Sequence, residues 1–172
     1  MQKMTILCTG KLKEKFYLDA VAEYVKRLNR FCKLEIIELP EERLPENPSP
    51  AQIEAALSKE ADAVRAKLPN GCLVIAMCVE GRERSSEELA RYLADSAAQG
   101  ASHIVFLIGS SFGMHESLKR QATLRLSMSP MTFPHHLLRV MLLEQIYRAY
   151  QINAGSRNHK KNFKRTHRTL LI

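Results

Sequence analysis

Hydrophobic and polar positions alternate along the chain between short apolar runs and longer stretches with helical spacing. Four runs rich in β-branched and other apolar residues predict strands, and they cover residues 4–9, 33–39, 72–79 and 104–108. After the first run, apolar residues recur every three or four positions from Val21 to Phe31, which predicts a helix. Strands that alternate with helices indicate an α/β fold. Because two of the runs are apolar throughout, we expect a mostly parallel sheet with helices on both faces.

Several boundaries are marked by capping and turn residues. Ser49 with Gln52, and Ser85 with Glu88, have the spacing of a capping box and predict the starts of two helices. Glu80 and Gly81 are expected to end the third strand. A helix over about 114–123, a short strand over 124–128 and a long apolar helix after Pro134 complete the expected order.

Length and composition fit one domain. The chain has 172 residues, of which 45% are hydrophobic, enough for one sizeable core and too few for two. No window approaches eighteen consecutive apolar residues and the first residues lack a signal-peptide pattern, so we expect a soluble, cytoplasmic protein. The four cysteines are well separated and form no CxxC pair, which favours buried reduced thiols over a disulfide or a zinc site.

Positive charge is concentrated near the end of the sequence. The net charge is +8, and residues 155–172 carry six Lys or Arg and no acid, which leaves +2 for the rest. A concentrated basic segment with one aromatic residue, Phe163, is typical of contact with a polyanion such as RNA. A solvated terminal segment without a partner explains the same pattern equally well.

Candidate ligand contacts lie in three loops that follow predicted strands. In α/β sheets ligands bind beyond the carboxyl ends of the strands, and here the loops are 78–81, 109–113 and 129–133. Neither GxGxxG nor GxxxxGK(S/T) occurs, so the sequence does not support a dinucleotide or triphosphate cradle. In the third loop, Met131 and Phe133 stand beside two prolines. Such a stiff apolar loop suits a flat heterocycle such as adenine.

Arg139 lies in an unexpected place. At about 100° per residue, the apolar residues of the helix after Pro134 fill one broad arc, and Arg139 falls near its middle. A guanidinium is almost never buried alone, so we expect it to meet an acid, a phosphate or a ligand near the helix start. Packing against a carboxylate and contact with a ligand both remain open. The arc is also broad enough to serve a dimer interface.

No metal site is expected. His135 and His136 are adjacent and point in different directions, and neither HExxH nor a zinc-type Cys/His spacing occurs.

Four segments together resemble the RlmH (YbeA-like) family of SPOUT-superfamily methyltransferases. They are Gly10–Glu14, Phe106–Gly113, Met131–Ile152 and the segment around His159. The resemblance implies one SPOUT domain over residues 1–160 with a C-terminal trefoil knot, followed by a basic extension over 161–172. It also implies a homodimer that uses S-adenosylmethionine to methylate N3 of a pseudouridine in helix 69 of large-subunit (23S) ribosomal RNA, on the assembled ribosome.

Carried over position by position, the resemblance implies which residues form the site. The cofactor pocket falls on Met77, Gly109, Met128, Ser129, Pro130, Met131, Thr132 and Phe133. We expect RNA contacts in the tail, at Arg157, Asn158, Lys160, Lys161, Lys164 and Arg165. The catalytic candidates are His159, as the base that takes the N3 proton, and Arg139, as a cation that stabilises the ring anion.

The chain departs from the family pattern at three positions. Ser110 stands where a second glycine is usual, Phe112 where a small polar residue is common, and Asn158 where a tyrosine is typical. Ser110 and Asn158 motivate an alternative, a non-catalytic ribosome- or RNA-binding module that keeps the fold without binding the donor. A third hypothesis is a flavin- or nucleotide-binding protein with no RNA substrate.

Overall fold

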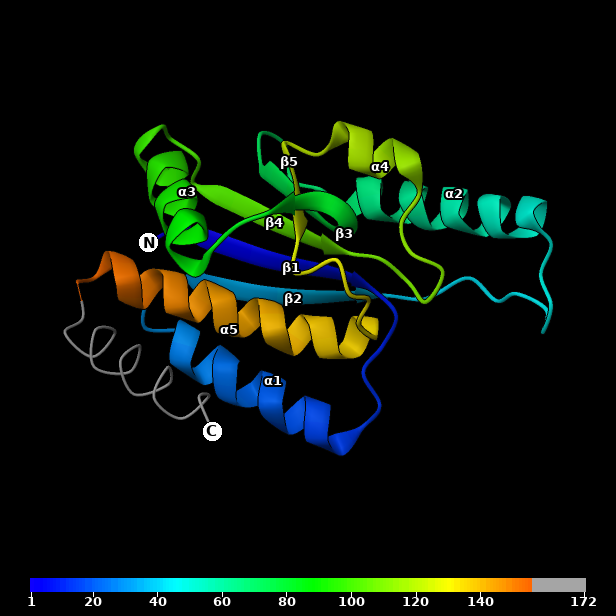
Figure 1. The fold of residues 1–172 in the computed structure, drawn as a ribbon, viewed down its shortest axis with the longest axis horizontal. Coiled ribbons are helices and arrows are strands. Elements are labelled where there is room, and N and C mark those ends of the chain that lie inside the picture. Colours follow the sequence, from blue (N-terminus) through cyan, green and yellow to red (C-terminus); the bar gives the residue numbers. More distant parts are fainter. Residues whose placement is uncertain (156–172) are drawn as a thin grey trace.

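The structure, a computed structural model, describes residues 1–155 and consists of one parallel sheet with helices on both faces (Figure 1). The strands pair in the order β2-β1-β4-β3-β5, and every neighbouring pair is parallel. They are β1 (Lys3–Thr9), β2 (Lys33–Leu39), β3 (Leu73–Glu83), β4 (His103–Ile108) and β5 (Leu124–Ser127). The helices are α1 (Lys15–Leu28), α2 (Pro50–Lys67), α3 (Ser86–Ala98), α4 (Glu116–Gln121) and α5 (His135–Asn153). The expected α/β fold is confirmed, whereas the trefoil knot stays a prediction.

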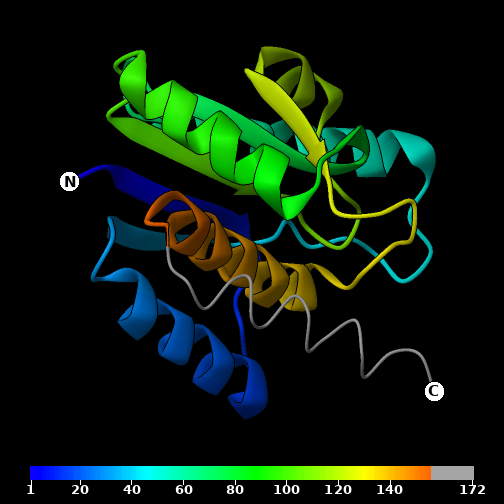
Figure 2. The same cartoon turned by 60° about the vertical axis from the view of Figure 1, so that its left-hand side comes forward.

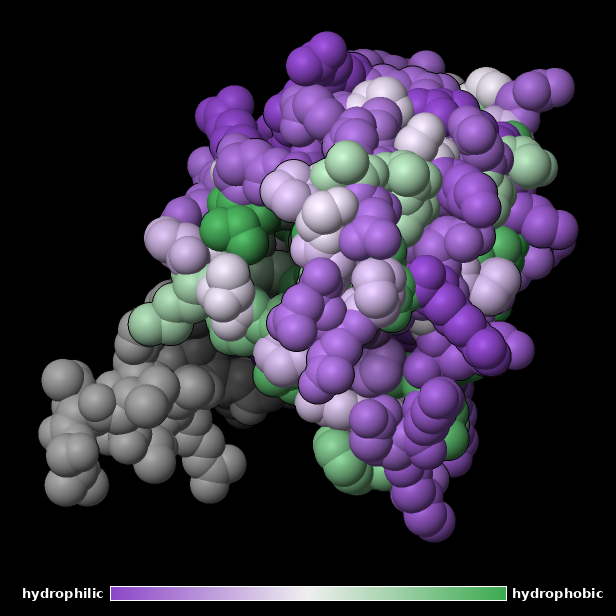
Figure 3. All heavy atoms as spheres, turned by 90° about the vertical axis from the view of Figure 1, so that its right-hand side faces the viewer, coloured by the Kyte–Doolittle hydropathy of each residue, from purple (hydrophilic) through white to green (hydrophobic). Residues whose placement is uncertain are grey.

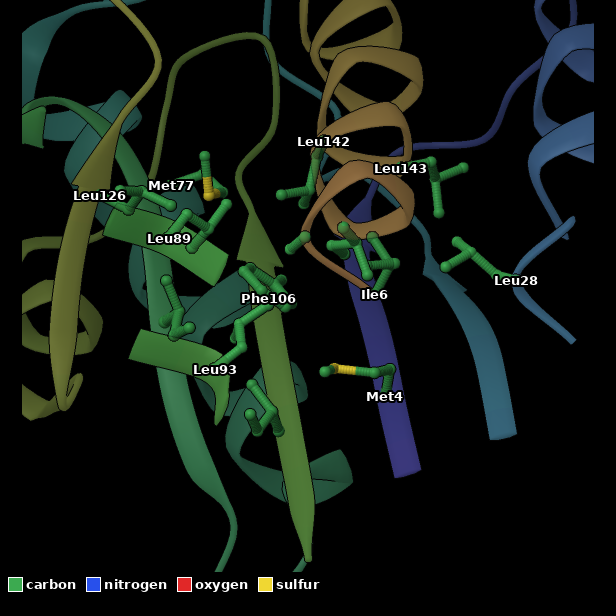
Figure 4. Close-up of a cluster of buried hydrophobic side chains, with 14 of the residues drawn as sticks. Met4, Ile6, Leu28, Met77, Leu89, Leu93, Phe106, Leu126, Leu142 and Leu143 are labelled. Carbon is green, nitrogen blue, oxygen red and sulfur yellow. The ribbon is translucent and has the colours of Figure 1, made fainter. Parts of the chain in front are cut away.

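The two faces of the sheet bury separate hydrophobic clusters. In β1, Met4 and Ile6 point to one face and Leu7 to the other, as the two-residue period of a strand requires. Figure 4 shows the first cluster, in which Phe106 of β4 lies among side chains from α1, α3 and α5. The second cluster lies under α2 and α4 and includes Val64. Burial on both faces explains the continuously apolar strands in the sequence.

Helix α5 uses its broad apolar arc within the chain. It lies against the sheet between α1 and α3, as the two ribbon views agree (Figures 1 and 2). Leu142, Leu143, Ile146 and Ala149 are fully buried there. Burial within the chain therefore explains these four residues of the arc, and the dimer interface stays a prediction.

Strand β3 is longer than the sequence predicts. We expected it to end at Glu80 and Gly81, but it pairs with β5 up to Glu83 after a register shift between Met77 and Arg82. A Cβ on Gly81 would lie 2.7 Å from the backbone carbon of Leu126, so only glycine permits this approach of the two strands. Because of the shift, residues 78–81 form a bulge in β3, between the part that ends at Met77 and the part that begins at Arg82.

The structure confirms both predicted capping boxes and part of the expectation for the cysteines. Ser49 accepts a hydrogen bond from the Gln52 amide and Ser85 accepts one from the Glu88 amide, so both predicted helix starts are confirmed. All four cysteines are free thiols. Cys8 and Cys32 are buried, but Cys72 and Cys78 are only half-buried, so the expectation of buried thiols holds for two of the four. Within residues 1–155, no helix is both long and apolar enough to span a membrane.

Candidate active site

The three predicted loops line one cavity at the carboxyl ends of the strands. The cavity has a volume of about 620 Å³, and its walls are residues 77–80, 108–114, 126–129 and 131–135, with Lys119 and Leu138. Figure 3 looks onto this end of the molecule, where hydrophobic residues gather around a hollow. Seven of the eight cofactor candidates lie in the walls. The exception is Pro130, which is exposed and is not part of the lining.

The loop after β4 makes a tight turn that requires Gly109. Ser110 and Gly113 exchange two backbone hydrogen bonds of 2.9 Å, which close the turn. A Cβ on Gly109 would lie only 2.3 Å from the carbonyl oxygen of Gly113, a distance no side chain tolerates. Only glycine at position 109 therefore lets this turn close beside the cavity.

Ser110 fixes the loop instead of blocking the cavity. Its hydroxyl donates a 2.8 Å hydrogen bond to Glu60 of α2, on the second face of the sheet. The next residue, Ser111, donates its amide to Glu41 at 2.9 Å. The departure from the family glycine thus adds an anchor to the loop.

Among residues 1–155, no cation forms a salt bridge with the Glu60 carboxyl group. It is 7% exposed and accepts hydrogen bonds from Ser110 and from the Glu42 amide. Burial raises the pKa of its carboxyl, and these two hydrogen bonds offset the rise only in part. Nothing in the hydrophobic pattern of α2 marks this residue, so the sequence did not identify it.

The loop between β5 and α5 is shaped by local hydrogen bonds. The Ser127 hydroxyl donates to the Ser129 carbonyl at 2.9 Å, and the Met131 amide donates to the Ser129 hydroxyl at 3.0 Å. These contacts turn the chain so that Met128, Thr132 and Phe133 line the cavity. Met131 also lines it and is 72% exposed, which places it at the mouth.

One ion pair interrupts the mostly apolar lining. Lys119 of α4 pairs with Glu80 of the bulge, and both side chains line the cavity. The hydrogen bond from Lys119 is the main reason why the pKa of Glu80 lies below its usual value. The pair joins the bulge of β3 to α4 across this wall.

Arg139 is buried behind the cavity and meets a carboxylate. The side chain is 1% exposed, donates from Nη1 to Glu38 at 2.6 Å and from Nη2 to the Gly10 carbonyl at 3.1 Å. Of the three kinds of partner that the sequence left open, an acid is present, and it is Glu38. Its neighbours His135 and Leu138 line the cavity, but Arg139 is not among the lining residues. Its catalytic role stays a prediction that this geometry does not support.

Glu38 connects Arg139 to the loop after β1. Its Oε2 atom also accepts a 2.8 Å hydrogen bond from the Leu12 amide. Burial raises the pKa of this carboxyl, but the hydrogen bonds from Arg139 and Leu12 outweigh burial, and the pKa lies below its usual value. The sequence did not single out Glu38, because a glutamate in the run KLEIIEL fits an ordinary strand.

The two histidines make separate contacts. His136 Nδ1 lies 3.4 Å from Glu14 Oε2, and His135 lines the cavity. Burial lowers the pKa of His135 below the ordinary value of 6.5, which favours the neutral ring. No group of three potential metal ligands occurs within the described part of the chain. His159 and the tail candidates Arg157, Asn158, Lys160, Lys161, Lys164 and Arg165 lie outside the described residues, as does the basic extension 161–172.

Comparison with known proteins decides the family. A family model described as "Predicted SPOUT methyltransferase" matches residues 2–159. The chain belongs to the SPOUT methyltransferase family. Within it, the chain is 46% identical over 158 residues to a "Ribosomal RNA large subunit methyltransferase H" from Streptococcus uberis, covering 92% of this chain and 99% of the relative. A protein of the same name from Bifidobacterium adolescentis matches with the same identity and coverage, and one from Lactobacillus delbrueckii is 44% identical over 155 residues, covering 90% of this chain and 98% of that protein. The resemblance to the RlmH family is confirmed.

A solved structure supports the fold independently. The crystal structure of a protein from Neisseria gonorrhoeae, assigned in its description to a methylase family, superposes with a TM-score of 0.50. The match covers 85% of this chain and 82% of the other, at 14% sequence identity. At that identity the likeness concerns the fold alone. The family assignment rests on the RlmH relatives and the family model.

Proposed function

We propose that this SPOUT protein is a ribosomal RNA methyltransferase that transfers a methyl group from S-adenosylmethionine to N3 of a pseudouridine in helix 69 of the large subunit. The observation that carries the proposal is the cavity built by the bulge of β3 and the loops after β4 and β5, in a chain so similar to RlmH proteins over nearly its whole length. The choice of pseudouridine and of its N3 atom rests on the family resemblance.

The cavity has the properties that S-adenosylmethionine requires. Its volume of about 620 Å³ lies within the range of small-molecule sites, and its walls are mostly apolar with few polar groups. Gly109 leaves backbone in close reach, since a Cβ there would fill the turn. Phe133 and Met128 supply apolar surface for a flat heterocycle. We therefore assign Met77, Gly109, Met128, Ser129, Met131, Thr132 and Phe133 to donor binding; Pro130 would act by stiffening the loop.

The residues of this chain would contribute mainly by positioning. When bound, the donor supplies an electrophilic methyl group on a sulfonium. The rigid turn at Gly109 and the hydrogen-bonded loop at Ser129 would hold one reactant in a fixed orientation, which lowers the entropic part of the barrier. The N3 proton of the target must also leave. We propose His159, a residue outside the described range, as its acceptor.

The geometry favours the enzyme over a non-catalytic binding module. That alternative depended on Ser110 and Asn158, and Ser110 turns its hydroxyl to Glu60 without closing the cavity. The homodimer and the RNA contacts of the basic tail remain part of the proposal through the family resemblance.

Two measurements on the purified protein test the proposed function. Calorimetry with S-adenosylmethionine should show binding, and ribosomes lacking the modification should gain one methyl group on a helix 69 pseudouridine, detected by mass spectrometry of the digested RNA. Absence of binding heat at about millimolar donor, together with retained ribosome binding, would support the non-catalytic module instead. Binding of the donor with methylation at another nucleotide would correct the target and keep the enzyme class.

A further inference from the structure

Beside the cavity, the loop after β1 and the first turn of α1 form a basic and aromatic surface. We propose that this Lys11–Phe16 surface (residues 11–16 with Tyr17 and His136) binds single-stranded ribosomal RNA next to the cavity. The identity of the RNA rests on the proposed function, but the surface is distinct from the donor pocket and from the basic tail.

A row of rings leads from the exposed surface to the cavity wall. Phe16 is 66% exposed, and its ring centroid lies 4.3 Å from that of Tyr17. Tyr17 meets His136 edge-on at 6.1 Å, and His136 meets His135 at 4.1 Å. His135 lines the cavity. Exposed rings offer stacking surface to unpaired bases of any sequence, so this row suits a single strand that approaches the cavity.

The surface carries two lysines that form no salt bridge within residues 1–155, although Lys11 lies near Glu38 and Lys13 near Glu14. Lys11 and Lys13 are exposed, and neither forms a salt bridge within residues 1–155. The nearby charges are already paired, Lys15 with Asp19 and Glu14 with His136. Two exposed ammonium groups beside an exposed phenyl ring match the alternating phosphates and bases of a nucleic acid strand.

The buried pair Arg139–Glu38 holds this surface in place. Arg139 donates to the Gly10 carbonyl and Glu38 accepts from the Leu12 amide, so both ends of the Gly10–Leu12 segment are fixed from behind. Leu12 is itself buried, which directs Lys11 and Lys13 outward. A backbone fixed in this way loses little entropy when RNA binds.

RNA explains this surface better than a protein partner does. Lysine is depleted in the centres of protein interfaces, whereas here two lysines flank the exposed ring. The apolar area is small, because only Phe16 and Leu18 are large exposed hydrophobic residues on α1. A second copy of this chain would bring the same lysines with it and meet like charge.

The test measures ribosome binding over a range of salt concentrations and methylation by the full-length protein. A plot of the logarithm of the ribosome-binding constant against the logarithm of the salt concentration should fall less steeply for the double variant Lys11→Ala/Lys13→Ala. Its slope should be smaller in magnitude by about 1.4, since each single-strand phosphate contact contributes about 0.7. Phe16→Ala should weaken binding and raise KM for ribosomes roughly tenfold, within the range for loss of one stacked base, while Phe16→Tyr retains binding. The donor affinity should stay unchanged in all of them, because none of these residues lines the cavity.

Matched controls lie elsewhere on the same molecule. Lys26→Ala/Lys33→Ala removes two exposed lysines at the far end of α1 and at the start of β2, and Leu18→Ala removes an exposed apolar side chain from the same helix. These control variants should leave the salt slope and the KM for ribosomes within about twofold of the values for the parent protein.

If wild type methylates ribosomes but the surface variants keep its slope and KM, the inference is overturned and the proposed function survives. If Phe16→Ala instead changes the mass in light scattering and the salt slope is unaltered, the surface joins two copies and the inference is likewise wrong. If wild type does not methylate ribosomes but the lysine variant shows the predicted change of slope, only the proposed function is wrong.

Discussion

Two loops at the same edge of the sheet are each held by a half-buried or buried glutamate, but in opposite electrostatic settings. The loop at 10–14 follows β1, and Glu38 accepts from its Leu12 amide while paired with Arg139. The loop at 109–113 follows β4, and Glu60 accepts from its Ser110 hydroxyl with no cation at hydrogen-bonding distance among the described residues. The pKa of Glu38 lies below its usual value and that of Glu60 lies above it.

The difference shows that a glutamate can hold a loop at this edge of the sheet in two ways, either paired with a cation or bonded only to neutral donors. The Arg139 guanidinium keeps Glu38 charged, and Glu38 in turn holds the backbone of the loop at 10–14. Hydroxyl and amide donors suffice for Glu60, which lies deeper and close to Glu41 and Glu42. The first arrangement favours the charged carboxylate and the second favours the neutral carboxyl, so the stability contributed by the two should change in opposite directions with pH.

The largest expected effect comes from removing the cation at the first loop. Arg139→Met should lower the free energy of unfolding by about 3 kcal/mol, because it leaves Glu38 without its charged partner and the Gly10 carbonyl without a donor. Urea unfolding followed by circular dichroism measures the change.

The same helix supplies the control for that experiment. Arg148 pairs with Glu144 but is 42% exposed, so Arg148→Met should cost less than about 1 kcal/mol. Equal losses in the two variants would show that burial adds nothing to the Arg139–Glu38 pair. The double variant Glu38→Met/Arg139→Met should recover part of the loss, since no unpaired charge remains.

A smaller effect is expected at the second loop, on the donor rather than on the fold. Gly109→Ala places a Cβ where the Gly113 carbonyl lies, so the turn must open and the cavity wall must move. We expect at least a tenfold loss of S-adenosylmethionine affinity by calorimetry. Gly71→Ala controls for a glycine substitution that strains the backbone without a collision, because Gly71 has a positive φ of 70° but no atom within 4 Å of its Cβ position. This variant should leave the donor affinity unchanged. An unchanged donor affinity in Gly109→Ala would place the donor away from this turn.

The sequence predicted elements and loops better than side-chain partners. Capping residues and apolar runs depend on neighbours within a few positions, so the helix starts at Ser49 and Ser85 and the succession of strands and helices along the chain could be inferred directly. The parallel arrangement then brought the three loops to one edge, which made the cavity predictable. The partner of Arg139 could not be found in this way, because Glu38 lies 101 positions earlier in the chain.

The misplaced details have the same physical origin. The end of β3 was set too early because its return to the ladder depends on Leu126 of β5, which no local pattern encodes. For Arg139 the choice between a carboxylate and a ligand stayed open, because helical spacing gives the direction of a residue around the helix axis but not which neighbouring element lies in that direction. At Arg139, that neighbour is the end of β2, which carries Glu38, and the loop after β1, which carries Gly10.

The smallest expected effect tests the electrostatic contrast between the two glutamates. The folded-state pKa of Glu60 is raised above 4.5, so its contribution to stability is fully present below that pH and is lost as pH rises through the folded pKa. The folded-state pKa of Glu38 is lowered below 4.5, so its contribution is present above 4.5 and is lost as pH falls through the folded pKa. Unfolding of wild type, Glu38→Gln and Glu60→Gln should therefore be compared from about pH 7 to about pH 4. The stability advantage of wild type over Glu60→Gln should grow towards acid, and its advantage over Glu38→Gln should shrink. If both advantages changed in the same direction, the two loops would share one electrostatic solution, and the contrast drawn between them would be wrong.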